Sequence, residues 1–123
     1  MTLYALFDKD CDLVGWIRPG EHIFNTDMSW AAFISNNHAW SAKTGNWLGP
    51  VKGLLCLDTK GRPVAWNPKE GVHGIAAPAK PARAAKAAKP ATPAKPATPP
   101  RPARPATPAG GWSPLSFYGW LAQ

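Results

Sequence analysis

The chain has 123 residues, of which 45% are hydrophobic and only 17% charged, with 15 Pro, 7 Trp and a formal net charge of +7. This length allows one modest domain with an appendage and excludes a large multi-domain enzyme. No apolar run approaches the roughly 20 residues that span a bilayer, and the N-terminus lacks the features of a signal peptide. Two cysteines are too few for a disulfide scaffold. We therefore expect a soluble, cytoplasmic protein without membrane contact.

Residues 1–75 carry no net charge and predict an all-β domain. Short apolar runs rich in aromatic residues alternate with turn residues about every ten positions, as in proteins built from short strands. No window sustains the 3.6-residue period of an amphipathic helix over three turns. We expect three or four repeated short β-hairpins around a centre rich in Trp and Phe.

An internal repeat supports this prediction. FDKDCDLVGW at 7–16 aligns with LDTKGRPVAW at 57–66, each giving a strand, an acidic turn and a strand with an inward Trp near its end. Gly61 allows the positive φ that hairpin turns need, whereas Cys11 at the equivalent position is sterically poorer. We expect a shorter third copy in AFISNNHAWS at 32–41, and further short strands at Ile23–Phe24 and NWLGPV.

The tryptophans divide into two groups by their place in this repeat. Trp16, Trp40 and Trp66 recur at equivalent positions and are predicted core residues. Trp30 and Trp47 fall outside the aligned ends and are the predicted surface aromatics. Because aromatic platforms recognise polyproline II segments, such a surface would suit the chain's own proline-rich tail or a partner's.

Residues 76–111 predict a disordered linker. Positions 76–109 contain only Ala, Pro, Lys, Arg and Thr, and they hold all of the net charge. Frequent proline excludes helix and favours polyproline II, and almost no apolar surface is available to stabilise a fold. The segment is either a self-repelling spacer or a sequence-independent nucleic-acid contact. The candidate phosphate-binding cations are Lys80, Arg83, Lys86, Lys89, Lys95, Arg101 and Arg104.

Residues 112–123 form the most apolar stretch of the chain. Ser113–Pro114 and Ser116 are alternative helix starts, the second for a short helix over 117–122. We expect this segment to fold back and complete the core, because small domains lack core residues. The alternative is docking onto a partner or a second copy, in which Trp112 and Trp120 would contact it.

Candidate chemistry is sparse. DKDCD resembles the opening of a calcium loop, but Leu13 and Pro19 occupy the positions of the required Gly and Glu. The histidines and cysteines lack the spacing of zinc ligands, and no nucleophile motif or phosphate-binding loop occurs. We therefore predict no catalytic residue, metal or cofactor, and a protein that is not an enzyme. The histidines and cysteines that could in principle be metal ligands are His22, His38, His73, Cys11 and Cys56.

Five stretches resemble the four-fold beta flower proteins: LYALFDKDCDLVGWI, HIFNTD, AFISNNHAWSAKTGNWLGPV, CLDTKGRPVAWNP and WSPLSFYGWL. The resemblance implies a small bacterial protein in which short β-hairpins surround a pseudo-four-fold centre, with a low-complexity link before the last stretch. Cys11 departs from the Gly expected in the first turn, which affects the turn rather than the fold. The resemblance implies no known reaction.

These observations favour a non-enzymatic interaction or scaffold module. Its partner would be a protein, or a second copy bound through the C-terminal segment. The predicted partner-binding residues are Trp30, Trp47, Trp112 and Trp120. The alternative is a weak, sequence-independent nucleic-acid binder that uses the basic linker.

Overall fold

The computed structural model describes residues 3–72, 88–94, 96–103, 105, 107, 108 and 110–123. In this part of the chain, eight short strands precede one short helix. They are β1 (Tyr4–Phe7), β2 (Leu13–Arg18), β3 (His22–Asn25), β4 (Trp30–Ser35), β5 (His38–Ser41), β6 (Trp47–Lys52), β7 (Leu55–Leu57), β8 (Pro63–Ala65) and α1 (Phe117–Leu121). Within the described residues, no helix has the length and apolarity needed to cross a membrane.

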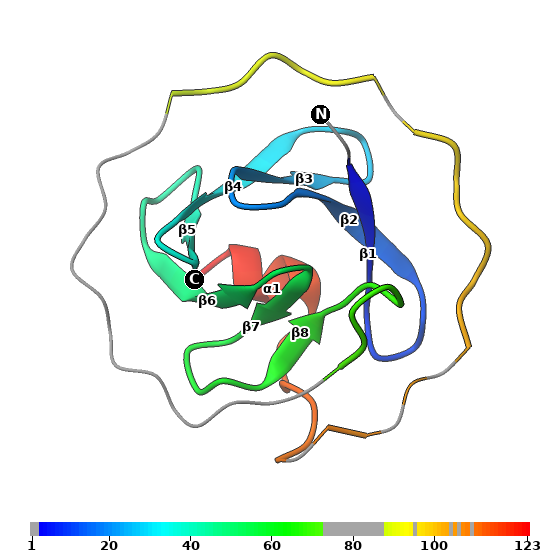
Figure 1. The fold of residues 1–123 in the computed structure, drawn as a ribbon. Coiled ribbons are helices and arrows are strands. Elements are labelled where there is room, and N and C mark those ends of the chain that lie inside the picture. The colour runs from blue at the N-terminus through cyan, green and yellow to red at the C-terminus, as the bar shows by residue number, and fades with distance from the viewer. Residues whose placement is uncertain (1–2, 73–87, 95, 104, 106, 109) are drawn as a thin grey trace.

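Each strand pairs antiparallel with the next along the chain, in the order β1 to β8. The first and last hairpins then meet through Phe7 and Trp66, whose backbone groups exchange N–H···O bonds of 2.8 and 2.9 Å. Because this bridge joins the two ends of the meander, the sheet is a nearly closed ring, and α1 lies inside its outline in Figure 1. The predicted all-β fold of repeated hairpins is confirmed.

The ring consists of four equivalent hairpins: hairpin 1 (β1–β2), hairpin 2 (β3–β4), hairpin 3 (β5–β6) and hairpin 4 (β7–β8). Each has a register shift near the end of its first strand. Each turn also places one residue at positive φ: Cys11 at 64°, Met28 at 67°, Gly45 at 75° and Gly61 at 85°. Left-handed backbone costs a residue with a side chain about 1–2 kcal/mol. At Cys11 and Met28, burial of the side chain offsets this cost.

The hairpin predicted at 32–41 exists, but it is not a third copy of the repeat. Phe33 pairs with Trp40, and Asn36 and Asn37 form the two-residue turn with φ of 51° and 64°. This turn links hairpin 2 to hairpin 3, at the opposite end of the strands from the hairpin turns. The second copy of the repeat is instead 22–35, where Met28 takes the left-handed position that Gly fills in hairpins 3 and 4.

Both faces of the strands are buried, and each face belongs to its own apolar cluster. Leu6 and Ile17 face inward and join a central cluster that includes Phe117 and Trp120 of α1. The neighbouring residues along the same strands, among them Trp16, lie in a second cluster, as strand alternation requires. The hairpin tryptophans predicted to meet at the centre are buried, but the central aromatic side chains come from the C-terminal segment.

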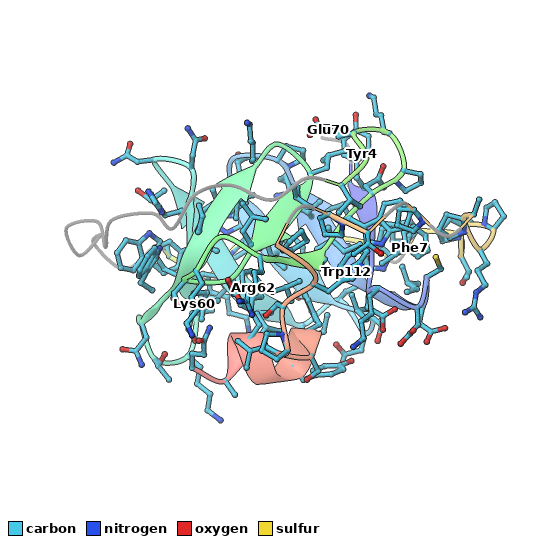
Figure 2. The ribbon with its side chains drawn as sticks, turned by 90° about the horizontal axis from the view of Figure 1, so that it is seen from below. Tyr4, Phe7, Lys60, Arg62, Glu70 and Trp112 are labelled. Atoms are coloured by element: carbon cyan, nitrogen blue, oxygen red, sulfur yellow. The ribbon has the colours of Figure 1, made fainter. Side chains whose placement is uncertain are left out.

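The C-terminal segment closes one end of the ring. Ser116 is the N-cap of α1, because its Oγ accepts the backbone N–H of Gly119 at 3.0 Å. Figure 2 shows α1 on the side of Lys60 and Arg62, which belong to the last hairpin turn, with Tyr4 and Glu70 at the opposite end. The helix is therefore placed among the hairpin turns rather than among the turns that link one hairpin to the next.

Candidate functional site

The acidic residues of the hairpin turns bind backbone N–H groups. The Oδ1 atom of Asp8 accepts the N–H groups of Asp10 and Asp12 at 2.9 and 3.0 Å. Asp58 holds the turn of hairpin 4 in the same way, through the N–H groups of Lys60 and Arg62 at 2.9 Å each. In the part of the chain that the structure describes, no three His, Cys, Asp or Glu side chains are grouped to hold a metal ion. DKDCD thus forms a capped hairpin turn.

The two cysteines are buried free thiols. Cys56 lies in the central cluster, and burial raises its pKa to about 12. Because the thiolate is the reactive form of cysteine, this side chain is a protonated core residue at neutral pH. Cys11 packs in the second cluster beneath its own turn. Of the histidines considered with them as metal ligands, His73 lies outside the described residues.

Two histidine–tryptophan pairs recur on adjacent hairpins. The indole Nε1–H of Trp30 donates to Nδ1 of His22 at 3.2 Å, and the rings meet edge to face with centroids 5.8 Å apart. Trp47 and His38 repeat both the 3.2 Å hydrogen bond and the 5.8 Å centroid distance. In each pair the histidine begins the first strand of the hairpin and the tryptophan begins the second. The outer face of hairpins 2 and 3 is therefore the candidate functional site.

The hydrogen bond fixes the tautomer of each neutral imidazole. Because Nδ1 of His22 and of His38 accepts a hydrogen bond, the neutral ring carries its proton on Nε2. Desolvation lowers the pKa of both histidines below the ordinary value of 6.5. At His22 the nearby Glu21 opposes this shift and Arg18 adds to it. Both rings are therefore neutral at pH 7, and each carries an Nε2–H donor.

The four tryptophans predicted to bind a partner occupy different environments. Trp30, Trp47 and Trp112 are half-buried, which leaves part of each ring accessible. Trp120, however, has no exposed surface, and its Nε1–H donates to two backbone carbonyls of the ring. In this conformation α1 places the Trp120 indole in the central cluster, where it is not accessible to a partner. Its role in partner binding therefore stays a prediction for the alternative in which the segment docks onto another molecule.

A groove of about 460 Å³ lies beside Trp30, between hairpins 2 and 3 and the proline-rich segment. Lys89 and Thr92 form one wall of this groove, and Lys43 lies on the hairpin side. Its lining residues are Asp27, Met28, Ser29, Trp30, Ala42, Lys43, Lys89 and Thr92. The position of Trp30 beside the proline-rich segment was not predicted from the sequence.

Only two of the seven cations predicted to contact phosphate fall within the described residues. Lys89 is exposed at the groove. Arg101 faces hairpin 1, where its Nη1 lies 3.4 Å from Oδ1 of Asp12 and its Nη2 donates to the carbonyl of Asp10. The other five lie outside the described residues: Lys80, Arg83, Lys86, Lys95 and Arg104.

A nearly closed ring of four β-hairpins, with a short helix at one end, defines a small β domain built from repeats. The family model for the 4-fold beta flower protein matches residues 4–121, from β1 through α1. The chain therefore belongs to the 4-fold beta flower family, and the resemblance found in the sequence is confirmed. Comparisons with curated proteins and with solved structures gave no match.

Proposed function

We propose that the chain is a non-enzymatic, cytoplasmic protein-interaction module whose partner-binding surface is formed by Trp30 and Trp47. The observation that carries this proposal is the repeated pair, in which the same hydrogen bond holds a half-buried indole on two adjacent hairpins. A ring already held in one orientation loses little side-chain entropy when it binds. Tryptophan is also enriched among the residues that dominate interface energies.

The chemistry of the two pairs favours an extended peptide as the bound part of the partner. Each pair presents part of an indole ring beside an imidazole whose Nε2 carries a proton. Proline or other apolar side chains pack on such rings, and the carbonyl groups of an extended backbone accept hydrogen bonds from such donors. Because the same pair occurs on two neighbouring hairpins, one extended segment that crosses both would meet the same chemistry twice.

The use of the polar side chains supports a non-enzymatic role. The Nδ1 atoms of His22 and His38, which a general base would need, already accept hydrogen bonds from the tryptophans. The hydroxyl oxygen of Ser41 accepts the N–H groups of Lys43 and Thr44 at 3.2 and 3.1 Å. These groups stabilise turns and aromatic side chains, which is what a binding scaffold requires.

Affinity capture at physiological salt tests the proposal. The purified chain is compared with the Trp30→Ala/Trp47→Ala double variant, and circular dichroism verifies that each bait is folded. We expect the double variant to retain about tenfold less partner than the wild-type chain. A tenfold loss of affinity corresponds to about 1.4 kcal/mol, which is within the range of interface anchor residues. Tyr118→Ala is the matched control, because Tyr118 is an exposed aromatic residue (57%) far from both pairs in sequence. Equal capture by the double variant would refute this surface.

The nucleic-acid alternative rests on the linker cations and remains a prediction. The contacts of Arg101 with Asp10 and Asp12 direct this cation toward the domain rather than toward a phosphate. Fluorescence anisotropy with single-stranded DNA at low salt would test it. Replacing all seven cations with Gln should abolish binding if the linker is the contact, because such binding depends on counterion release.

A further inference from the structure

The segment between the hairpin ring and α1 has a strict three-residue period. From residue 90 to residue 108, every third position is proline: 90, 93, 96, 99, 102, 105 and 108. We call this proline the first position of each triplet. The second position is Ala, except that Pro100 occupies it once, and the third position is Lys, Arg or Thr. Polyproline II has three residues per turn. The sequence thus places proline, small and polar residues on three separate faces of one extended helix.

Burial in the structure follows these three faces. The described prolines of the first position are half-buried, and Pro108 is buried. The described residues of the second and third positions are exposed, from Ala91 and Thr92 to Thr107. Pro100 provides an internal control, because it is a proline in the second position and it is exposed. Position in the triplet, rather than residue type, therefore decides which side chains are covered.

Polar contacts fix the place of the segment along the ring. Lys89 and Thr92 lie beside the turns of hairpins 2 and 3, and Arg101 contacts Asp10 and Asp12 in the turn of hairpin 1. Pro105 then lies beside Trp112, where the chain enters the C-terminal segment. The described pieces accordingly follow the outside of the ring in Figure 1. The charges are complementary, because this part of the chain has cations and no acids, while hairpin 1 has three acids in its turn.

We propose that the described residues of 88–108 are an intramolecular ligand of the hairpin ring, bound as a polyproline II strap through the proline face. This surface shares Trp30 with the proposed partner surface, but it also includes the turn of hairpin 1 and Trp112, which the proposed function does not use. The strap can therefore be tested apart from the proposed function, through Trp112. It replaces the predicted disordered spacer in this stretch with a bound segment. The site is therefore a receptor for basic, proline-rich peptides with a three-residue period, and the chain's own segment occupies it.

The exposed ion pair of the strap contributes little to its binding, so the proposal assigns the affinity to the proline face. Both side chains of the Arg101–Asp12 ion pair are more than half exposed, at 67% and 60%, so this contact sets the register rather than the affinity. Proline is restricted in φ before it docks, which reduces the entropy lost on binding. Polyproline II has no internal hydrogen bonds, so order in this segment has to come from contact with the ring.

NMR relaxation of the full chain tests the proposal through strap amides that the wild-type chain and the variants share. In the wild-type chain we expect order parameters above about 0.6 at residues 94, 98 and 101, the lower bound for ordered backbone. A swapped variant exchanges proline with the following alanine at 90/91, 96/97 and 102/103. This variant keeps the length, charge and composition but breaks the proline face, so its strap amides should fall below about 0.6. The matched control exchanges Ala with Thr at 91/92 and 97/98, which leaves every proline in place and should keep the wild-type order.

A peptide added in trans tests the receptor directly. A synthetic peptide with the sequence of residues 88–108 should shift the Trp112 indole resonance of the swapped variant saturably. A peptide carrying the three proline–alanine exchanges should not shift it. Order parameters below about 0.6 in the wild-type strap, or equal order in the swapped variant, would overturn the proposal. So would strap order that disappears on dilution together with a dimeric mass, because the occupant would then be a second copy.

Discussion

Replacing Trp120 with phenylalanine tests whether the C-terminal segment is part of the folded core. The indole Nε1–H donates to the carbonyl of Leu48 at 2.7 Å and to that of Leu57 at 3.1 Å, and Trp120 has no exposed surface. The substitution removes both bonds and leaves two buried carbonyls short of a donor, which costs about 1–3 kcal/mol. It also empties roughly 40 Å³, which adds about 1 kcal/mol. We expect Trp120→Phe to lower the free energy of unfolding by about 2–4 kcal/mol.

Urea denaturation followed by far-ultraviolet circular dichroism measures this loss. Tyr118→Phe is the matched control on the same helix, because Tyr118 is exposed and its ring is kept. The control should lie within about 0.5 kcal/mol of wild type. A loss below about 0.5 kcal/mol for Trp120→Phe would refute the reasoning, because α1 would then add little to the stability of the ring.

Two further predictions concern the backbone of the ring and its histidines. A Cβ at Gly49 would lie 2.1 Å from the carbonyl oxygen of Leu57, at a φ of 140°, so Gly49→Ala should cost about 3 kcal/mol or more in urea denaturation. Gly20→Ala, at a φ of 75° with open space around it, should cost only about 1 kcal/mol. If both variants lost the same stability, the close contact between Gly49 and the backbone of Leu57 would not be the cause. The pKa values of His22 and His38 are lower in the folded chain than the ordinary 6.5, so the unfolded chain binds more protons as the pH falls. Their contribution to stability should therefore be complete above about pH 6.5 and be lost as the pH falls from 6.5 through the folded pKa values. Urea midpoints between pH 8 and 5.5 measure this loss, which the His22→Gln/His38→Gln variant should reduce and which an unchanged slope would contradict.

The local parts of the fold were predictable because their determinants lie within a few residues. Gly61 and the cap Asp58 mark the turn of hairpin 4, and the aligned DKDCD placed Cys11 in the left-handed position that it adopts. Ser116 was one of two predicted helix starts and is the observed N-cap. Hairpin 2 was missed because Met28 has none of the usual features of a residue at positive φ.

The assignment of inner and outer faces could not be predicted from the sequence. Adjacent residues such as Leu6 and Phe7 are both buried, because both faces of the ring are covered, so hydrophobic alternation does not distinguish them. Closure of the ring depends on Phe7 and Trp66, whose pairing over a long sequence separation leaves no local pattern.

The candidate site was predictable only in part. The partial exposure of Trp30 and Trp47 was predictable from their place outside the aligned repeat. Their hydrogen-bond partners were not predictable, because the His–Trp spacing is eight residues in hairpin 2 and nine in hairpin 3. The signal that was available is the recurrence of a histidine at the start of each hairpin's first strand. The proline period was equally visible in the sequence, but only the structure shows that the prolines of the first position are less exposed than their neighbours.

The position of α1 in the chain has a consequence for synthesis. The ring is complete in sequence once Trp66 has been made, yet Phe117 and Trp120, which fill its centre, follow about 50 residues later. At ribosomal rates of about 5–20 residues per second, this interval lasts roughly 3–10 s. During that time the hairpins can pair, but the apolar centre has no helix to cover it. The length of the proline-rich segment therefore sets how long the apolar centre of a nascent ring stays exposed to other molecules.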